Sequence, residues 1–313
     1  MRTAAILVLV LAAAFGVWRL VVYRSPVDRG IAALNEAFAA QRPLQSRVTE
    51  LRYARYSSTR GDKSAINQSA LDLSSLLLQT ALHDAPSTQT RHAVGRVYLL
   101  KGEFDRAITE FEEALKTSPA NARLHSDLAA ALLEKAKLER RDDESGRSET
   151  TLAGSYDQVN EALTLDSSML DARFNRALLF EAMGLDPQAL ADWEKYLSLD
   201  SNSQWATEVR SHIEEIRKRT ERASKREADL FTEFTNAQQA GVDDQMWQVF
   251  SKSHLRTGNY ITNTIVDKYL DAATTARKDE ADKWSQALFR LGELSRTRSG
   301  DSFTSDMSRA YSG

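Results

Sequence analysis

The chain has 313 residues, of which 42% are hydrophobic and 27% charged, and its formal net charge is −3. Acidic and basic residues are spread along the sequence, which excludes the concentrated basic stretch of a nucleic-acid-binding protein. Because the chain has no cysteine, disulfides, thiolate metal sites and a cysteine nucleophile are excluded within it. The low content of proline and glycine predicts a mostly helical, all-α protein.

The N-terminal residues form an apolar run. Ala4–Tyr23 contains one charged residue, Arg19, near its end, and is about as long as a helix that crosses a bilayer. Trp18 suits the membrane interface. We therefore predict a transmembrane anchor over residues 1–25. A cleaved signal peptide ending at Ala12–Ala14 and a buried core helix are the alternatives.

The orientation of this anchor depends on the basic residues around it. Arg24 and Arg29 follow the apolar run, and by the positive-inside bias they place the body of the protein in the cytoplasm. A short basic tail before a long domain is also typical of anchors that export the domain behind them. We predict a single-pass protein of the inner or cell membrane with its body on the exported, periplasmic side. The cytoplasmic side is the alternative.

Residues 26–64 are predicted to form an amphipathic helix and a linker. Apolar residues recur at helical spacing within Val27–Gln41, and Pro43 ends the helix. The stretch that follows is rich in arginine and tyrosine and has no regular period. It is either an ordered linker that lies over the helices after it, or part of a second family resemblance described below.

Arg91–Pro119 is the most regular part of the chain. The apolar spacing indicates one short helix around Tyr98 and another around Phe111. Gly102 separates them, because glycine adopts the left-handed helix cap at low cost. The stretch resembles a tetratricopeptide repeat (TPR), a helix-turn-helix unit of about 34 residues. The residues that match the family pattern are Gly95, Tyr98, Gly102, Phe104, Ala107, Phe111, Ala114 and Pro119.

The TPR resemblance implies an α-solenoid of helix-turn-helix repeats over residues 65–240. Residues 65–83 cap it at one end, and a long helix over 207–239 caps it at the other. Tyr196 stands where the family has a small alanine, so we expect looser packing there. The predicted repeats lie near 88–121, 122–169 and 170–203, and the second contains an inserted loop at 139–150.

Residues 241–313 are predicted to form a C-terminal helical region without clear repeats. This region and the linker before the repeats resemble bacterial proteins in which TPRs precede a CHAT domain, a caspase-like peptidase. The resemblance implies a sensing or scaffold region without the catalytic domain, since that peptidase needs a cysteine. The residues that carry it are Arg42, Pro43, Arg47, Tyr53, Arg60, Gly61, Gly258, Asp267, Asp271 and Ala272.

No motif in the sequence predicts catalysis or a bound cofactor. The chain has no HExxH pair, no glycine-rich phosphate loop and no GxSxG elbow. His92 and His125 lie at similar positions of consecutive helices, but a structural metal site needs three or four ligands. Residues 142–144 are acidic but lack the spacing of a calcium loop. We predict a protein that is not an enzyme and has no cofactor and no metal.

The concave groove of the solenoid is the predicted binding site. In the TPR family, the first helix of each repeat lines a groove that holds a partner peptide. Asn175 matches the family's asparagine, whose side-chain amide pairs with a partner backbone, whereas Ala93 and Asp127 depart from it. Solvated positions and contacts within the solenoid are the alternative roles for these residues. The resemblance assigns partner binding to His92, Arg96, Arg123, Ser126, Asp127, Asp171, Phe174, Asn175 and Leu178.

These observations predict a non-catalytic, membrane-anchored TPR scaffold or adaptor that binds a protein or peptide partner and no nucleic acid. The alternative is a regulatory or sensing subunit of a CHAT-type peptidase system whose catalytic chain is separate. Self-association through the ends of the solenoid or through the amphipathic helix is left open.

Overall fold

The computed structural model describes residues 25–57, 66–142, 146–255, 258–300, 306–307 and 309–310. The predicted membrane anchor, and Arg60 and Gly61 of the linker, lie outside these residues. Among the helices that are described, none combines the length and the apolar character that a membrane span requires. The chain divides into two compact units, Met1–Glu214 and Glu215–Gly313.

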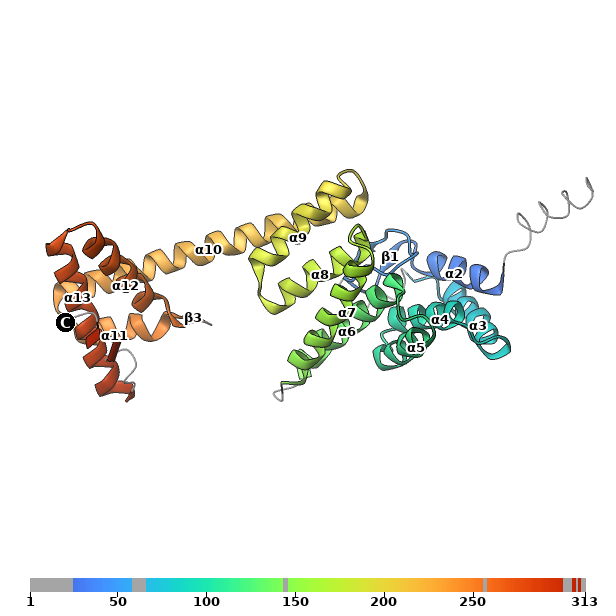
Figure 1. Ribbon diagram of the computed structural model, residues 1–313, viewed down its shortest axis with the longest axis horizontal. Coiled ribbons are helices and arrows are strands. Elements are labelled where there is room, and N and C mark those ends of the chain that lie inside the picture. Colours follow the sequence, from blue (N-terminus) through green and yellow to red (C-terminus); the bar gives the residue numbers. More distant parts are fainter. Residues whose placement is uncertain are drawn as a thin grey trace, which may run out of the picture. The chain divides into compact units, whose positions relative to one another are not determined.

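The first unit is a stack of helices in chain order (Figure 1). Each helix contacts the next one, and α4, α6 and α8 also contact one another in turn, so that they share one face of the stack. This arrangement confirms the predicted all-α, TPR-like solenoid. The helices are α2 (Pro26–Ala37), α3 (Gln68–Asp84), α4 (Thr88–Lys101), α5 (Phe104–Thr117), α6 (Ala122–Asp142), α7 (Arg147–Leu165), α8 (Leu170–Met183) and α9 (Asp186–Leu199).

The pair α4 and α5 forms as the sequence predicts. Ser87 begins α4 with a side chain that accepts a hydrogen bond from the N–H of Thr90. Gly102 ends it in the left-handed region, with φ 77°. Gly95 allows the helices to approach closely, because a Cβ there would lie 2.4 Å from a ring carbon of Phe111. The short residues of the TPR pattern therefore set the distance between these helices.

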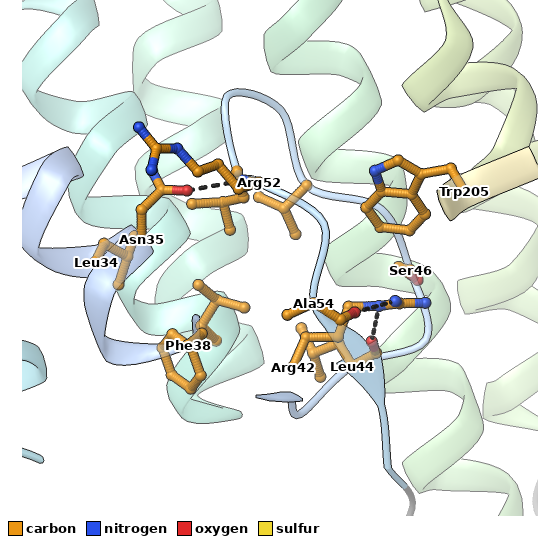
Figure 2. A pocket seen from close by; sticks show the side chains of 12 residues that line it. Leu34, Asn35, Phe38, Arg42, Leu44, Ser46, Arg52, Ala54 and Trp205 are labelled. Carbon is orange, nitrogen blue, oxygen red and sulfur yellow. Dashed lines mark hydrogen bonds between the residues drawn. The ribbon is translucent and has the colours of Figure 1, made fainter. Parts of the chain in front are cut away.

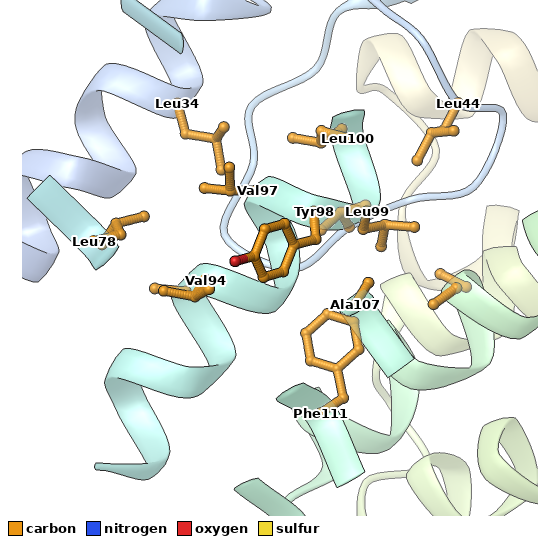
Figure 3. Packing of buried hydrophobic residues seen from close by; sticks show 14 of the residues in the cluster. Leu34, Leu44, Leu78, Val94, Val97, Tyr98, Leu99, Leu100, Ala107 and Phe111 are labelled. Carbon is orange, nitrogen blue, oxygen red and sulfur yellow. The ribbon is translucent and has the colours of Figure 1, made fainter. Parts of the chain in front are cut away.

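A hydrophobic core runs through the first part of the stack (Figure 3). Leu34 from α2, Leu78 from α3 and Phe111 from α5 are fully buried in it. Leu44 and Val48 join the same core, although they belong to the segment between α2 and α3. Burial of apolar surface on this scale is the main favourable contribution to folding, so that segment is part of the folded core.

The predicted loop at 139–150 is wrong. Helix α6 continues to Asp142 and α7 begins at Arg147, and only residues 143–145 between them lie outside the described part. Thr151 of α7 donates a hydrogen bond of 2.7 Å to Glu139 of α6. The charged residues are good helix formers, so they lengthen both helices where the sequence suggested an irregular loop.

The second unit contains a separate core around Phe234, Met246 and Leu288. The long helix α10 begins in the first unit and ends in the second, so the units divide after residue 214 and not at the predicted boundary of 240. The helix that follows α10 ends at residue 252, and a short antiparallel strand pair comes after it. The elements are α10 (Gln204–Ala240), α11 (Asp243–Lys252), β3 (His254–Leu255), β4 (Gly258–Asn259), α12 (Tyr260–Thr274) and α13 (Lys278–Ser299).

Candidate functional site: a groove that holds a segment of its own chain

Residues 42–55 form a closed loop that lies against the shared face of α4, α6 and α8. We name these residues the groove segment. The strands at its ends, β1 (Gln41–Arg42) and β2 (Arg55–Tyr56), pair in parallel. The segment leaves and rejoins the surface at one place, like an Ω-loop. Figure 2 shows it passing between the helices.

Arg42 holds the two ends of the groove segment together. Its guanidinium donates to the backbone carbonyls of Leu44 at 2.9 Å and Ala54 at 2.5 Å. It also pairs with Glu208 of α10 and lies 4.5 Å from the ring centre of Trp205. A buried guanidinium is stable only with such partners, so the loop shape and the start of α10 depend on one another.

Asn175 of α8 forms hydrogen bonds with the backbone of the groove segment. Its side-chain oxygen accepts from the N–H of Arg47 at 2.8 Å, and its side-chain nitrogen donates to the carbonyl of Arg47 at 2.8 Å. The sequence led us to expect that Asn175 pairs with the backbone of a partner, whereas here it pairs with a backbone of the same chain. Its role toward a partner stays a prediction.

Two carboxylates of α6 bind further backbone groups of the segment. Asp127 accepts from the N–H of Thr49 at 2.8 Å, and Glu134 accepts from the N–H of Ser46 at 3.0 Å. Both carboxylates also accept from the hydroxyl of the same residue. The seven-residue spacing places Asp127 and Glu134 on one face of the helix, so the segment runs along α6.

Asp127 is fully buried and has several donors around it. His92 approaches it at 2.8 Å and the Arg96 guanidinium at 2.9 Å, in addition to Thr49. Burial alone raises the pKa of this carboxyl, but the hydrogen bond from His92 and the charge of Arg96 outweigh it and lower the pKa to about 2. Asp127 is consequently a fixed negative charge at the centre of the groove.

His92 is neutral in this arrangement. Its burial, and next the adjacent charge of Arg96, lower the pKa of the imidazole below its ordinary value. The Nε2 atom faces Asp127 as a donor, while Nδ1 lies 3.4 Å from an Arg96 nitrogen as an acceptor. His92 thus positions Asp127 and makes no direct hydrogen bond to the segment among those described.

Glu50 is the acidic residue of the groove segment that contacts α4 and α6. Its carboxylate pairs with Arg96 at 2.9 Å and with Arg123 at 2.8 Å. Its φ of 63° is unusual for a residue with a side chain, because only glycine and asparagine visit this left-handed region at low cost. Glu50 therefore turns the backbone sharply where the segment leaves α4 and α6.

Arg47 is a basic residue of the groove segment and contacts α8 and α9. Its guanidinium pairs with Asp171 at 2.6 Å, donates to the hydroxyl of Tyr196 at 2.5 Å and lies 4.8 Å from the ring centre of Trp205. Burial raises the pKa of Asp171, and the charge of Arg47 offsets part of this effect. A cation in this position is held by a carboxylate, a hydroxyl and an aromatic face.

The expectation of looser packing at Tyr196 is wrong. The side chain is fully buried, and its ring centre lies 5.9 Å from that of Phe174. Burial, and next the charge of Asp200, raise the pKa of Tyr196 to about 12. The large ring of Tyr196 lies next to Phe174 of α8, and its hydroxyl bonds Arg47 of the groove segment; the repeat pattern alone does not describe these contacts.

A family model of known proteins matches part of the first unit. Residues 95–135 match the family model of the TPR repeat. This stretch, which lies in α4, α5 and α6, is similar to a tetratricopeptide repeat. No curated protein matches the sequence.

Solved structures resemble the chain at low sequence identity. A thermophilic TPR protein of Thermus thermophilus is 16% identical, with a TM-score of 0.42 over 71% of this chain and 92% of that one. The Pseudomonas aeruginosa protein pilF is 18% identical, with a TM-score of 0.39 over 78% of this chain and 90% of that one.

The structure brings most of the predicted partner-binding residues to the groove segment. Those with a direct contact to it are Arg96, Arg123, Asp127, Asp171 and Asn175. Phe174 packs instead against other rings, with its centre 4.9 Å from that of Trp193, and Leu178 and Ser126 are buried in the first unit. Their roles toward a partner stay predictions.

The sequence missed several residues that hold the segment. They are Glu134, Tyr196, Trp205 and Glu208. The helical spacing from Asp127 would have indicated Glu134, but no motif points to the aromatic residues. A cavity of about 20 Å³ remains between the segment and α2 (Figure 2), enough for about one water molecule.

The described residues contain no cluster that could hold a metal ion. His125 contacts Gln158 at 2.7 Å and the carbonyl of Pro119 at 2.7 Å, whereas His92 faces Asp127. The two histidines thus have separate surroundings, and each of them is engaged in a hydrogen bond within the TPR region.

Proposed function

We propose that this protein is a non-catalytic, membrane-anchored TPR scaffold that binds a partner protein. The observation that carries the proposal is the two-point pairing of Asn175 with the backbone of Arg47. A side-chain amide that bonds both the N–H and the carbonyl of one backbone residue suits recognition of a linear segment. The groove therefore has the chemistry of a peptide-binding surface.

The ionisation of the groove supports a binding role. A general base works best with a pKa near the operating pH, whereas the pKa of Asp127 is about 2. The Nε2 atom of His92 is hydrogen-bonded to a carboxylate oxygen of Asp127 at 2.8 Å. Both groups are used for positioning, and this favours binding over catalysis.

Membrane attachment is proposed from the sequence. The apolar run Ala4–Tyr23 precedes α2 with only a short connection, so an anchor there would hold the TPR region close to the bilayer. We propose that the body lies on the exported side. The cytoplasmic side remains the competing proposal.

A role as a regulatory subunit of a CHAT-type peptidase is the competing function. Arg42 and Arg47, which carry that resemblance, hold the groove segment in place, and Tyr53 packs edge-on against Trp205 at 5.0 Å. Packing thus accounts for these residues without a peptidase partner. For this reason we favour the scaffold function.

Crosslinking in living cells tests the scaffold proposal. A photo-crosslinking amino acid replaces Arg123, whose side chain lies at the rim of the groove and is 63% exposed. The matched control carries it at Glu112, an exposed position of α5. We expect covalent adducts with a specific protein from position 123 and none with that protein from position 112. A folded protein that yields no adduct at position 123 would refute the proposal.

A further inference from the structure

Residues 46–50 occupy the groove as a bound peptide would, with a turn at residues 49–50. We infer that the groove recognises a segment of a partner protein in which a basic, an apolar, a hydroxyl and an acidic residue follow one another. In this chain, Arg47–Glu50 carries that pattern and occupies the site as a built-in competitor. The inference rests on the proposed function, because it names the partner chemistry of the same groove.

The backbone contacts would serve any segment that adopts the same backbone path. Asn175 binds both the N–H and the carbonyl of one residue, and Asp127 accepts from the N–H two residues later. Such bonds do not depend on which side chains the ligand carries. They fix the direction and register of the ligand, and specificity has to come from the side chains.

The first side-chain position selects a basic residue. The Arg47 guanidinium meets the carboxylate of Asp171 and the hydroxyl of Tyr196 and lies over Trp205. An acidic residue there would face Asp171 and be repelled. The planar guanidinium matches a carboxylate and an aromatic face better than the compact ammonium of lysine does, so we expect arginine to be preferred.

The next positions select an apolar and then a hydroxyl residue. Val48 is only 3% exposed and packs in the hydrophobic core. The hydroxyl of Thr49 donates to Asp127 at 2.6 Å and accepts from Arg96 at 2.6 Å. An apolar side chain in place of Thr49 would leave these buried groups unsatisfied, which is costly.

The last position selects an acidic residue at the rim. Glu50 pairs with Arg96 and Arg123, and its own side chain is 39% exposed. The backbone turns at this position, with φ 63° at Glu50 and a hydrogen bond of 3.3 Å from the N–H of Leu51 to the carbonyl of Val48. The left-handed backbone at Glu50 is strained, and this strain offsets part of the binding energy of the built-in segment.

The connection at both ends favours the built-in segment. A short tether raises the effective concentration of a ligand to the order of millimolar. A partner must therefore bind more tightly, or present several copies, to displace residues 46–50. By competing for the groove, the groove segment raises the affinity that a partner needs in order to bind.

A peptide-binding measurement tests the inference. The probe is a fluorescent peptide with residues 43–52 of this sequence, added to the full chain in detergent micelles and followed by anisotropy. We expect the Arg47→Ala variant, whose own segment is weakened, to bind the probe about tenfold more tightly than the wild-type chain does. The control probe carries Arg47→Glu and should not bind. A second variant, Glu50→Gln, changes only the rim and should show a smaller effect in the same direction.

Each result decides for or against the inference. Loss of probe binding when Asp171→Ala is added to the Arg47→Ala chain would support it. If both weakened variants keep their helical circular dichroism and neither binds the probe at about 1 mM, the concentration scale of a short tether, the inference is wrong. The inference would also be wrong if the wild-type chain bound the probe as tightly as the Arg47→Ala variant does. Specific adducts from position 123 without probe binding would leave the scaffold function standing and reject only this partner chemistry.

Discussion

Asp127 is the charge on which the groove segment depends. It joins the backbone of Thr49 to His92 and Arg96. Replacement by alanine leaves the Arg96 guanidinium, which is 2% exposed, without its buried partner. Breaking a buried ion pair on one side typically costs about 3–5 kcal/mol. We expect a loss of that size in the free energy of unfolding, measured with urea, and little loss for Asp105→Ala, whose ion pair with Lys135 is exposed.

The same cluster predicts how acid affects stability. The pKa of Asp127 is lowered from an ordinary 3.8 to about 2, so its contribution is present above about pH 4 and is lost as the pH falls toward 2. The lowered pKa values of His92 and Glu134 act in the same direction. The raised pKa of Asp171 acts oppositely, because its contribution is lost as the pH rises.

We therefore expect the free energy of unfolding to fall on acidification, with about 2 kcal/mol of the fall due to Asp127. Urea titrations of the wild-type chain and of Asp127→Asn, at a series of pH values, measure this difference. The variant should be less stable near neutral pH and should lose less on acidification. Parallel pH profiles would contradict the assigned role of this carboxylate.

Two glycines test separately the effects of close packing and of helix propensity on stability. A Cβ at Gly95 would lie 2.4 Å from the Phe111 ring, whereas one at Gly154 would lie 3.7 Å from Leu132. We expect Gly95→Ala to destabilise the chain by about 1–3 kcal/mol through overpacking. Gly154→Ala should stabilise it by up to about 1 kcal/mol, because alanine favours the helix. Thermal unfolding of both variants tests this expectation. A shift of the melting temperature in the same direction for both variants would contradict it.

At the scale of elements, the groove segment is docked by side chains distant in sequence. We expect Asn175→Ala to lower the free energy of unfolding by about 1–3 kcal/mol, because two backbone groups of Arg47 lose their partner. Asn202→Ala, in an exposed turn, should change it by less than about 0.5 kcal/mol. Hydrogen exchange at the amide of Arg47 should rise only in the first variant. Unchanged exchange there would mean that Asn175 does not hold the segment.

The helix pairs could be predicted because their signals are local. Gly102 ends α4 and Gly95 allows the approach of α5, and both lie within the pattern they define. The groove segment could not be predicted in the same way. The partners of Arg47, Asp171 and Asn175, are more than a hundred residues away, and no periodicity relates them. Ordinary linkers have the same composition, so only the structure shows that this one fills the groove.

The charged stretch between α6 and α7 shows a second limit of the sequence. Polar composition predicted a loop, but Glu139 belongs to a longer helix and accepts a hydrogen bond from Thr151 of the next helix. Composition reports exposure to solvent, while helix formation depends on propensity and on the packed face. Leu152 and Ser148 supply that buried face in α7.

At the scale of the molecule, the chain has two compact units with separate cores. We expect Leu288→Ala, in the core of the second unit, to cost that unit about 2–5 kcal/mol. Hydrogen exchange should then rise in α12 and α13 and stay unchanged in α4 to α8. Phe289→Ala is the control, because this neighbouring side chain is 49% exposed. A uniform rise across both units would show that they unfold together.

The proposed function anchors the chain to a membrane, and the side on which the first unit would then lie decides where a partner can be found. The chain has no cysteine, so Ser168→Cys introduces a unique thiol. Ser168 is exposed in the turn between α7 and α8, and its loss removes only a local hydrogen bond to Asp166. We expect a membrane-impermeant maleimide to label this thiol in intact cells, with any outer membrane permeabilised, because the proposed body is exported. Labelling only after lysis would place the TPR region in the cytoplasm and direct the search for partners there. A shortened, soluble product in the same experiment would mean that Ala4–Tyr23 is a cleaved signal and not an anchor.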